Sequence, residues 1–165
     1  MVDGYNFINA WENLRKIAEE DLDSARKKLI DILADFSGYK GYKITIVFDS
    51  HLVKGSMRRK ETISNVEVIF TKEGETADNY IEQYVYKNSK NEKIGVVTSD
   101  YLEQLIILGD GALRIPPREL IHEIEHYRKE IEKKEKEKMY KNSKLEDALE
   151  DDIIRKLEKF KKNLE

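Results

Sequence analysis

The stretch that decides the fold is Lys43-Ile44-Thr45-Ile46-Val47-Phe48, which is followed at once by Asp49. It is rich in β-branched residues and almost continuously apolar, as is typical of a strand covered on both faces. A second stretch of this kind, Ile94-Gly95-Val96-Val97-Thr98, is followed after one residue by Asp100. Strands of this type occur in parallel sheets, where functional sites lie at the carboxyl ends of the strands.

Two shorter stretches, residues 66–70 and 112–115, complete a set of four predicted strands. Apolar residues at helical spacing lie around and between them, which predicts helices there. The predicted helices are residues 22–36, which end before Gly38, residues 77–85 behind a capping Thr76, and residues 120–131 behind Pro116-Pro117. Strands that alternate with helices predict an α/β fold with a mostly parallel sheet.

The composition excludes several classes of protein. The 165 residues include no cysteine, so there can be no disulfide framework, thiolate nucleophile or cysteine-ligated zinc. No apolar run approaches the roughly 18 residues of a membrane span, and the first residues do not resemble a secretory signal. We therefore expect a cytoplasmic protein with no membrane partner.

The net charge of −3 argues against a uniformly basic nucleic-acid binder, but the charges are unevenly distributed. Residues 1–128 hold 18 basic and 22 acidic groups, whereas residues 129–165 hold 12 basic and 11 acidic groups. The second region is a Lys/Glu run that reaches a turn-like Asn142-Ser143 and then continues with apolar residues at helical spacing. We expect a solvated helical hairpin there, with a basic-faced arm for RNA as the alternative.

Four aspartates occupy the ends of predicted strands or the start of the following helix: Asp3, Asp49, Asp78 and Asp100. Glu82 lies one helical turn beyond Asp78. Parallel strands would bring the aspartates to one edge of the sheet, where like charges repel unless Mg²⁺ or Mn²⁺ binds between them. Any one of them could instead cap a helix, but four together favour a metal site that activates water against a phosphodiester.

Several spaced motifs carry a resemblance to a known family. They are Val2-Asp3-Gly4-Tyr5-Asn6-Phe7-Ile8 with Trp11, Phe70-Thr71 with Glu73, Glu75-Thr76-Ala77-Asp78-Asn79-Tyr80-Ile81-Glu82, Val97-Thr98-Ser99-Asp100 with Glu103-Gln104, Gly109-Asp110-Gly111-Ala112 and Arg118-Glu119-Leu120. In this order they resemble the NYN domain of the YacP-like family, within the PIN-like nuclease superfamily. The resemblance implies a PIN-like three-layer α/β/α domain in residues 1–128 and a helical extension in residues 129–165.

The resemblance further implies a metal-dependent endoribonuclease that associates with ribosomes and cuts messenger RNA. We expect a metal-activated water to attack the phosphodiester in line and to leave a 5′-phosphate. The carboxylates that would bind metal and act in catalysis are Asp3, Asp78 and Asp100, with Asp49 as a fourth acid. The polar groups that would support them are Asn6, Ser99 and Glu82. In the family several apolar residues usually precede the first aspartate, whereas here only Met1 and Val2 do. Either the central first strand is a stub or the natural start lies upstream.

The residues expected to hold RNA follow Asp49 in residues 51–60, the most basic stretch of the first 128 residues. The cations of this predicted loop that could contact phosphates are Lys54, Arg58, Arg59 and Lys60. A merely solvated loop is the alternative. Tyr5 and Trp11 could stack on bases beside Asp3, although we favour a core position for Trp11.

Two other functions remain open. One is a non-catalytic RNA- or ribosome-binding module with the same fold. The other is a zinc peptidase, because His122-Glu123-Ile124-Glu125-His126 matches H-E-x-x-H, in which two histidines bind zinc and the glutamate acts as base. Glutamate makes up 21 of the 165 residues, so this match arises easily by chance. We favour a pair of exposed histidines on a helix.

Overall fold

The computed structural model describes residues 1–50, 57–99 and 111–162, with side chains described as far as residue 140. By proximity of Cα atoms the chain divides into two compact units, Met1–Ile124 and Glu125–Glu165. Within the described ranges no helix combines the length and the apolar character needed to cross a membrane.

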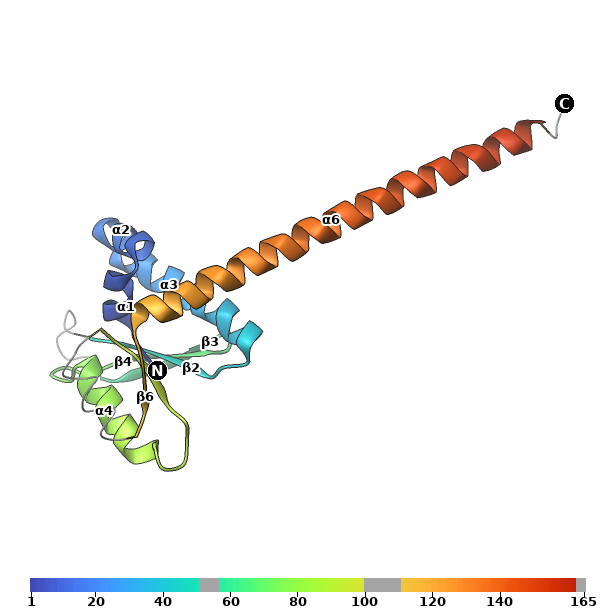
Figure 1. Cartoon of the computed structure of the whole chain (residues 1–165). Helices are drawn as coiled ribbons and strands as arrows, with labels where there is room; N and C mark the ends of the chain where they lie inside the picture. Colours follow the sequence, from blue (N-terminus) through green and yellow to red (C-terminus); the bar gives the residue numbers. More distant parts are fainter. Residues whose placement is uncertain (51–56, 100–110, 163–165) are drawn as a thin grey trace. The chain divides into compact units, whose positions relative to one another are not determined.

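A six-stranded sheet forms the centre of the first unit, in the order β3-β4-β2-β1-β5-β6 (Figure 1). The strands are β1 (Val2–Asp3), β2 (Ile44–Phe48), β3 (Arg59–Ile63), β4 (Val66–Phe70), β5 (Gly95–Val97) and β6 (Leu113–Ile115). Neighbouring strands are parallel except β3, which runs antiparallel to β4. All five residues of β2 are buried, as predicted. The short β1 is central, because it pairs with both β2 and β5.

Helices cover both faces of this sheet (Figure 1). The helices on one face are α1 (Gly4–Ala10), α2 (Glu12–Glu20) and α3 (Leu22–Lys40). On the other face lies α4 (Ala77–Asn88), whose Ile81 and Val85 belong to one buried cluster with Val47 and Ile69 of the sheet. The predicted three-layer α/β/α fold with a mostly parallel sheet is thereby confirmed.

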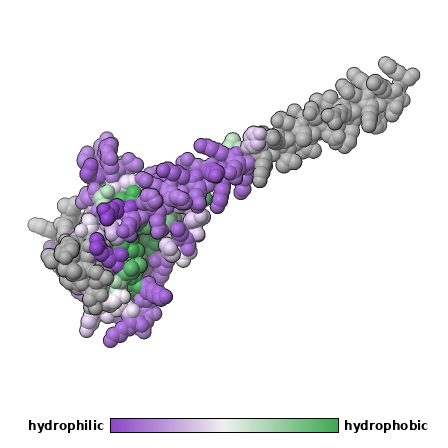
Figure 2. Space-filling model, viewed as in Figure 1, coloured by the Kyte–Doolittle hydropathy of each residue, from purple (hydrophilic) through white to green (hydrophobic). Residues whose placement is uncertain are grey.

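The surface of the first unit is dominated by polar residues. On the face seen in Figure 2, hydrophilic residues cover most of the described surface and surround a smaller hydrophobic area. This distribution agrees with the charged fraction of 38%, which is far above the usual quarter.

Two local predictions for the first unit were wrong. Residues 59–63 form the edge strand β3 and not part of a loop, since a polar edge strand lacks the apolar alternation by which strands are recognised. Helix α3 continues through Gly38 to Lys40 and ends at Gly41, whose φ of 71° lies in the left-handed region that glycine adopts without strain. One glycine inside a helix costs only about 1 kcal/mol, so Gly38 does not stop the helix.

The predicted hairpin in the second region was also wrong. Helix α6 runs from Pro117 to Lys162 and passes through Asn142 and Ser143 without a turn. Residues 118–162 contain neither glycine nor proline. Asparagine and serine disfavour a helix by less than about 1 kcal/mol, and the neighbouring Lys/Glu pairs support it.

Gly4, the first residue of α1, allows close contact with β2. A Cβ atom at this position would lie 2.2 Å from a ring carbon of Phe48, whose side chain is completely buried. We expect Gly4→Ala to lower the free energy of unfolding by about 2–3 kcal/mol because the ring has no room to move. Urea denaturation measures this effect.

Gly38→Ala is the matched control for this substitution. A Cβ atom at Gly38 would meet only an Asn65 side-chain nitrogen at 3.6 Å. Because alanine is favoured over glycine inside a helix, this variant should be more stable by about 0.5–1 kcal/mol. Equal effects of the two substitutions would contradict the packing described for Gly4.

Candidate active site

Three of the four predicted aspartates come together at the carboxyl ends of the parallel strands. Asp3 ends β1, Asp49 directly follows β2, and Asp78 is the second residue of α4. The Asp3 side chain is close enough to Asp78 to hydrogen-bond with it and to be influenced by the charge of Asp49. Asp100, the fourth, lies outside the described residues. Asp78 and Asp49 therefore both lie near enough to Asp3 for their charges to act on it.

The pKa of the Asp3 carboxyl group is strongly shifted. It is only 9% exposed. Burial, reinforced by the Asp78 and Asp49 charges and by a hydrogen bond with Asp78, raises its pKa from 3.8 to about 7. The backbone N–H of Asn6 donates to Asp3 Oδ1 at 3.0 Å and partly opposes this rise. Asp3 is thus held in an environment where its negative charge is costly in the absence of a cation.

Asn6 connects Asp3 to the end of β5. Its side-chain Oδ1 accepts hydrogen bonds from the backbone N–H of Ser99 at 3.0 Å and from Ser99 Oγ at 2.6 Å. Since the Asn6 backbone also binds Asp3, one residue ties together two segments that lie 93 residues apart in the sequence. This is the geometry expected of residues that support a site.

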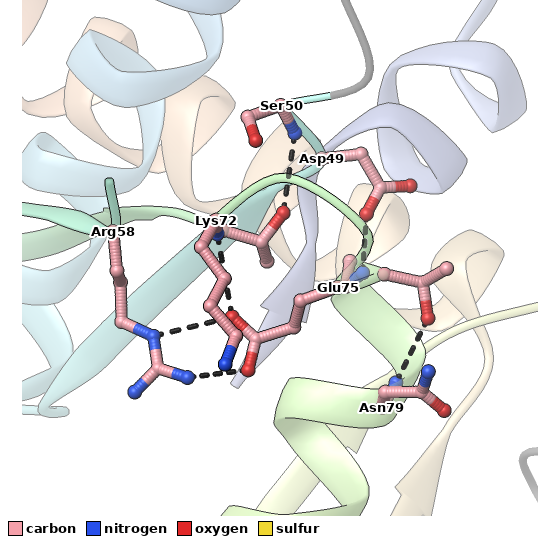
Figure 3. Close-up of polar contacts among 9 residues, drawn as sticks. Asp49, Ser50, Arg58, Lys72, Glu75 and Asn79 are labelled. Atoms are coloured by element: carbon pink, nitrogen blue, oxygen red, sulfur yellow. Dashed lines mark hydrogen bonds and ion pairs between the residues drawn. The ribbon is translucent and has the colours of Figure 1, made fainter. Parts of the chain in front are cut away.

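Asp49 acts on the backbone at the start of α4. Its Oδ1 accepts a hydrogen bond from the Ala77 N–H (Figure 3). Beside it, the Ser50 N–H donates to Oγ1 of Thr71, a fully buried residue, at 3.1 Å. Thr76 caps α4 as predicted, because its Oγ1 accepts from the Asn79 N–H at 3.1 Å. Asp49 therefore orients the helix that carries Asp78.

The donor atoms at this edge suit a hard divalent cation, because Mg²⁺ and Mn²⁺ prefer carboxylate oxygens. A cation would also relieve the repulsion between buried Asp3 and Asp78. In the part of the chain whose side chains are described, no three His, Cys, Asp or Glu residues are placed to hold an ion by themselves. That Asp3, Asp78 and Asp100 together bind a metal stays a prediction, since Asp100 lies outside the described residues. Glu82 lies half-buried one turn further along α4.

The predicted RNA-contacting cations that are described all pair with carboxylates. Arg58 contacts Glu75, Arg59 Nε lies 2.7 Å from Glu61, and Lys60 Nζ lies 2.6 Å from Glu67. All three cations are exposed residues, although Arg58 and Arg59 also lie over aromatic rings. Lys54 lies outside the described residues. Whether these side chains bind RNA stays a prediction.

The two aromatic residues near Asp3 differ in their environments. Trp11 is 5% exposed and packs edge-on against Phe7 with ring centroids 5.9 Å apart, so the preferred core position is confirmed. Tyr5 is half-buried, and its ring centroid lies 5.2 Å from that of Phe48. Arg26 donates a hydrogen bond to its hydroxyl group. The Arg26 guanidinium carbon also lies over the Tyr5 ring, 5.9 Å from its centroid, so Tyr5 is only partly accessible.

The H-E-x-x-H motif lies on α6. His122, Glu123 and His126 are all exposed, as expected of a solvent-facing pair of histidines. Glu123 Oε2 lies 3.8 Å from Lys40 Nζ. A zinc peptidase needs its ligands in a shaped cavity, so the exposure of these residues gives the peptidase interpretation no support.

Sequence reasoning missed the role of Glu75. This residue was quoted only as part of a motif, yet it is one of the few buried charged residues of the described chain, at 7% exposure. Its guanidinium partner, Arg58, is 17 positions away in the sequence. The available signal was the acidic residue between a buried strand and a helix cap, but no spacing rule could have identified its partner.

Comparisons with known proteins identify the family of the chain. The YacP-like NYN domain model matches residues 1–162. YacP of Bacillus subtilis (strain 168), which is described as uncharacterized, is 40% identical over 163 residues, or 98% of this chain and 95% of that protein. The crystal structure of Rae1 (YacP) from Bacillus subtilis matches with a TM-score of 0.72 and 41% identity, covering 98% of this chain and 92% of that one.

A point mutant of Rae1 (YacP) from Bacillus subtilis has also been solved as a crystal structure. It matches with a TM-score of 0.69 and 43% identity over 80% of this chain and 77% of that chain. These likenesses confirm the family that the spaced motifs indicated. The chain belongs to the YacP-like NYN domain family and carries a nuclease-type domain with a PIN-like fold.

Proposed function

We propose that this chain is a metal-dependent endoribonuclease that hydrolyses phosphodiester bonds in RNA and leaves 5′-phosphate ends. The observation that carries the proposal is the burial of Asp3 beside Asp78 at the carboxyl ends of the parallel strands, where the pKa of Asp3 rises to about 7. Carboxylates kept together at such a cost are typical of functional sites. The nuclease-type family supports the choice of reaction.

In this proposal, three aspartates bind the metal and two further residues hold them in position. Asp3, Asp78 and Asp100 would hold Mg²⁺ or Mn²⁺, which when bound neutralises phosphodiester charge and lowers the pKa of water. Asn6 would keep Asp3 and Ser99 in register through its hydrogen bonds to both. Asp49 would hold the start of α4 through Ala77.

The substrate and its location are further parts of the proposal. Messenger RNA is the proposed substrate, the ribosome a proposed partner and the cytoplasm the proposed compartment. Arg59 and Lys60, which are exposed on β3, would provide salt-dependent contacts to phosphates. Lys54, outside the described residues, is a further proposed contact. Tyr5 would offer a surface on which a base could stack.

The test is cleavage of a labelled single-stranded RNA in the presence and absence of divalent metal. We expect cleavage in Mg²⁺ or Mn²⁺, complete loss in excess EDTA and recovery when metal is restored, because carboxylates alone cannot neutralise the phosphodiester. The product ends are identified by ligation, which requires a 5′-phosphate. RNA binding without cleavage under every metal condition would favour the non-catalytic module. Cleavage that persists in EDTA would contradict a metal-dependent mechanism.

A further inference from the structure

Glu75 lies in the turn between β4 and α4, three residues before Asp78. At 7% exposure its carboxylate is almost completely withdrawn from water, which is costly unless charge and hydrogen bonds compensate. Arg58 compensates it with two hydrogen bonds, from Nε to Oε2 at 3.2 Å and from the terminal NH2 to Oε1 (Figure 3). The Lys72 N–H also donates to Oε2, at 3.4 Å. Both carboxylate oxygens of Glu75 are therefore engaged within the chain.

Arg58 links this turn to helix α4 and to strand β3. It directly precedes β3, and its guanidinium carbon lies 4.9 Å from the ring centroid of Tyr80, in the first turn of α4. A planar guanidinium that makes two hydrogen bonds to a carboxylate and stacks on an aromatic ring has a defined orientation. A lysine could not reproduce this orientation. The Arg58–Glu75 pair thus joins three segments of the chain.

The same turn is held from its other side by Asp49, which accepts from the Ala77 N–H. Asp78 follows immediately, so the residue that faces Asp3 is attached to a backbone fixed by two independent carboxylates. A misplacement of about 1 Å in a reacting group can cost about a hundred-fold in rate. The position of Asp78 therefore depends on the support given to the turn before it.

We propose that Glu75 and Arg58 form a positioning pair that holds the N-terminus of α4 so that Asp78 meets Asp3. This inference rests on the proposed function, because it concerns the geometry of the proposed metal site. Neither residue touches the metal or the RNA in this role. This positioning role differs from the role predicted for Arg58 from the sequence, in which its side chain contacts RNA phosphates.

A double-mutant cycle of Glu75→Gln and Arg58→Met tests the pair in the full chain. We expect each single variant to lower kcat for RNA cleavage about tenfold or more while KM changes by less than about threefold. The double variant should be no slower than the slower single variant, because the two side chains act as one unit. Glu61→Gln is the matched control, since it breaks the pair with Arg59, also on β3, and should leave kcat unchanged.

Mn²⁺ affinity without RNA provides a readout that is independent of turnover. For variants whose urea unfolding resembles that of the parent, we expect Glu75→Gln to weaken Mn²⁺ binding about 10- to 100-fold, as for other groups that orient metal ligands. A Glu75→Gln protein with parental kcat and Mn²⁺ affinity would overturn the positioning pair while the proposed function stands. A raised KM in Arg58→Met alone would assign Arg58 to RNA contact instead. A parent that neither cuts RNA nor binds Mn²⁺ would overturn the proposed function and this inference together.

Discussion

Asp78→Asn should lower kcat for metal-dependent RNA cleavage by at least about a hundred-fold and leave RNA binding nearly unchanged. The amide keeps the shape of the carboxyl group but removes the negative charge that would hold the cation near Asp3. Loss of a single electrostatic group at a reaction centre typically costs about 10²–10³ in rate. Single-turnover cleavage measured beside RNA binding separates the two effects.

The matched control for Asp78→Asn is Glu12→Gln. Glu12 is also an acidic residue in the first turn of a helix, but its side chain is 66% exposed and it pairs only with Lys16 on the same helix. Both substitutions remove an acidic side chain from the first turn of a helix, but only Asp78→Asn removes a carboxylate that acts on Asp3, so Glu12→Gln should leave cleavage unchanged. Parental cleavage by Asp78→Asn would exclude this carboxylate from the reaction.

Asp3→Asn should abolish cleavage and at the same time stabilise the metal-free protein. Folding raises the pKa of Asp3 from 3.8 to about 7, so the folded chain binds a proton more tightly than the unfolded chain does. The stability from this proton is present below about pH 4 and is lost as the pH rises through 7. The free energy of unfolding of Asp3→Asn, measured relative to that of the parent, should therefore increase by roughly 2–3 kcal/mol as the pH rises from 5 to 8.

Urea unfolding in EDTA at the two pH values measures this gain. Asp31→Asn, which removes an exposed carboxylate from α3, is the control for the loss of one charge. Adding Mg²⁺ should stabilise the parent and narrow its difference from Asp3→Asn, because a ligand that binds the folded state stabilises it. A constant difference between parent and Asp3→Asn across this range would show that Asp3 is not desolvated as described.

The sheet could be predicted where strands are buried on both faces. β2 and β5 appear in the sequence as nearly continuous apolar runs, and the parallel arrangement follows from the helices between strands. The polar edge strand β3 carries no such signal, because its Arg-Lys-Glu-Thr-Ile sequence faces solvent for most of its length. The short α1 and α2 were not predicted: Asp3, which caps α1 through the Asn6 N–H, was interpreted as a metal ligand, and α2 begins after Trp11 without a side-chain cap.

The residues of the candidate site could be predicted from the sequence, but the hydrogen bonds that join them could not. Asp3 and Asp49 could be chosen from their strand-end positions, and Asp78 from its place at the start of the helix that follows β4. The hydrogen bonds from Ser99 to Asn6 and from Arg58 to Glu75 join distant segments, and only the folded chain reveals them. The sequence also could not predict that the Asp49 carboxylate accepts a hydrogen bond from the Ala77 N–H.

The central claim is that Asp3 and Asp78 share one divalent cation, and a crystal soaked in Mn²⁺ tests it most directly. Anomalous scattering locates manganese without reference to any assumed ligand. We expect a peak in contact with carboxylate oxygens of both Asp3 and Asp78, and loss of that peak in Asp78→Asn crystals. A peak that touches neither residue, or one that is unchanged in Asp78→Asn, would contradict it.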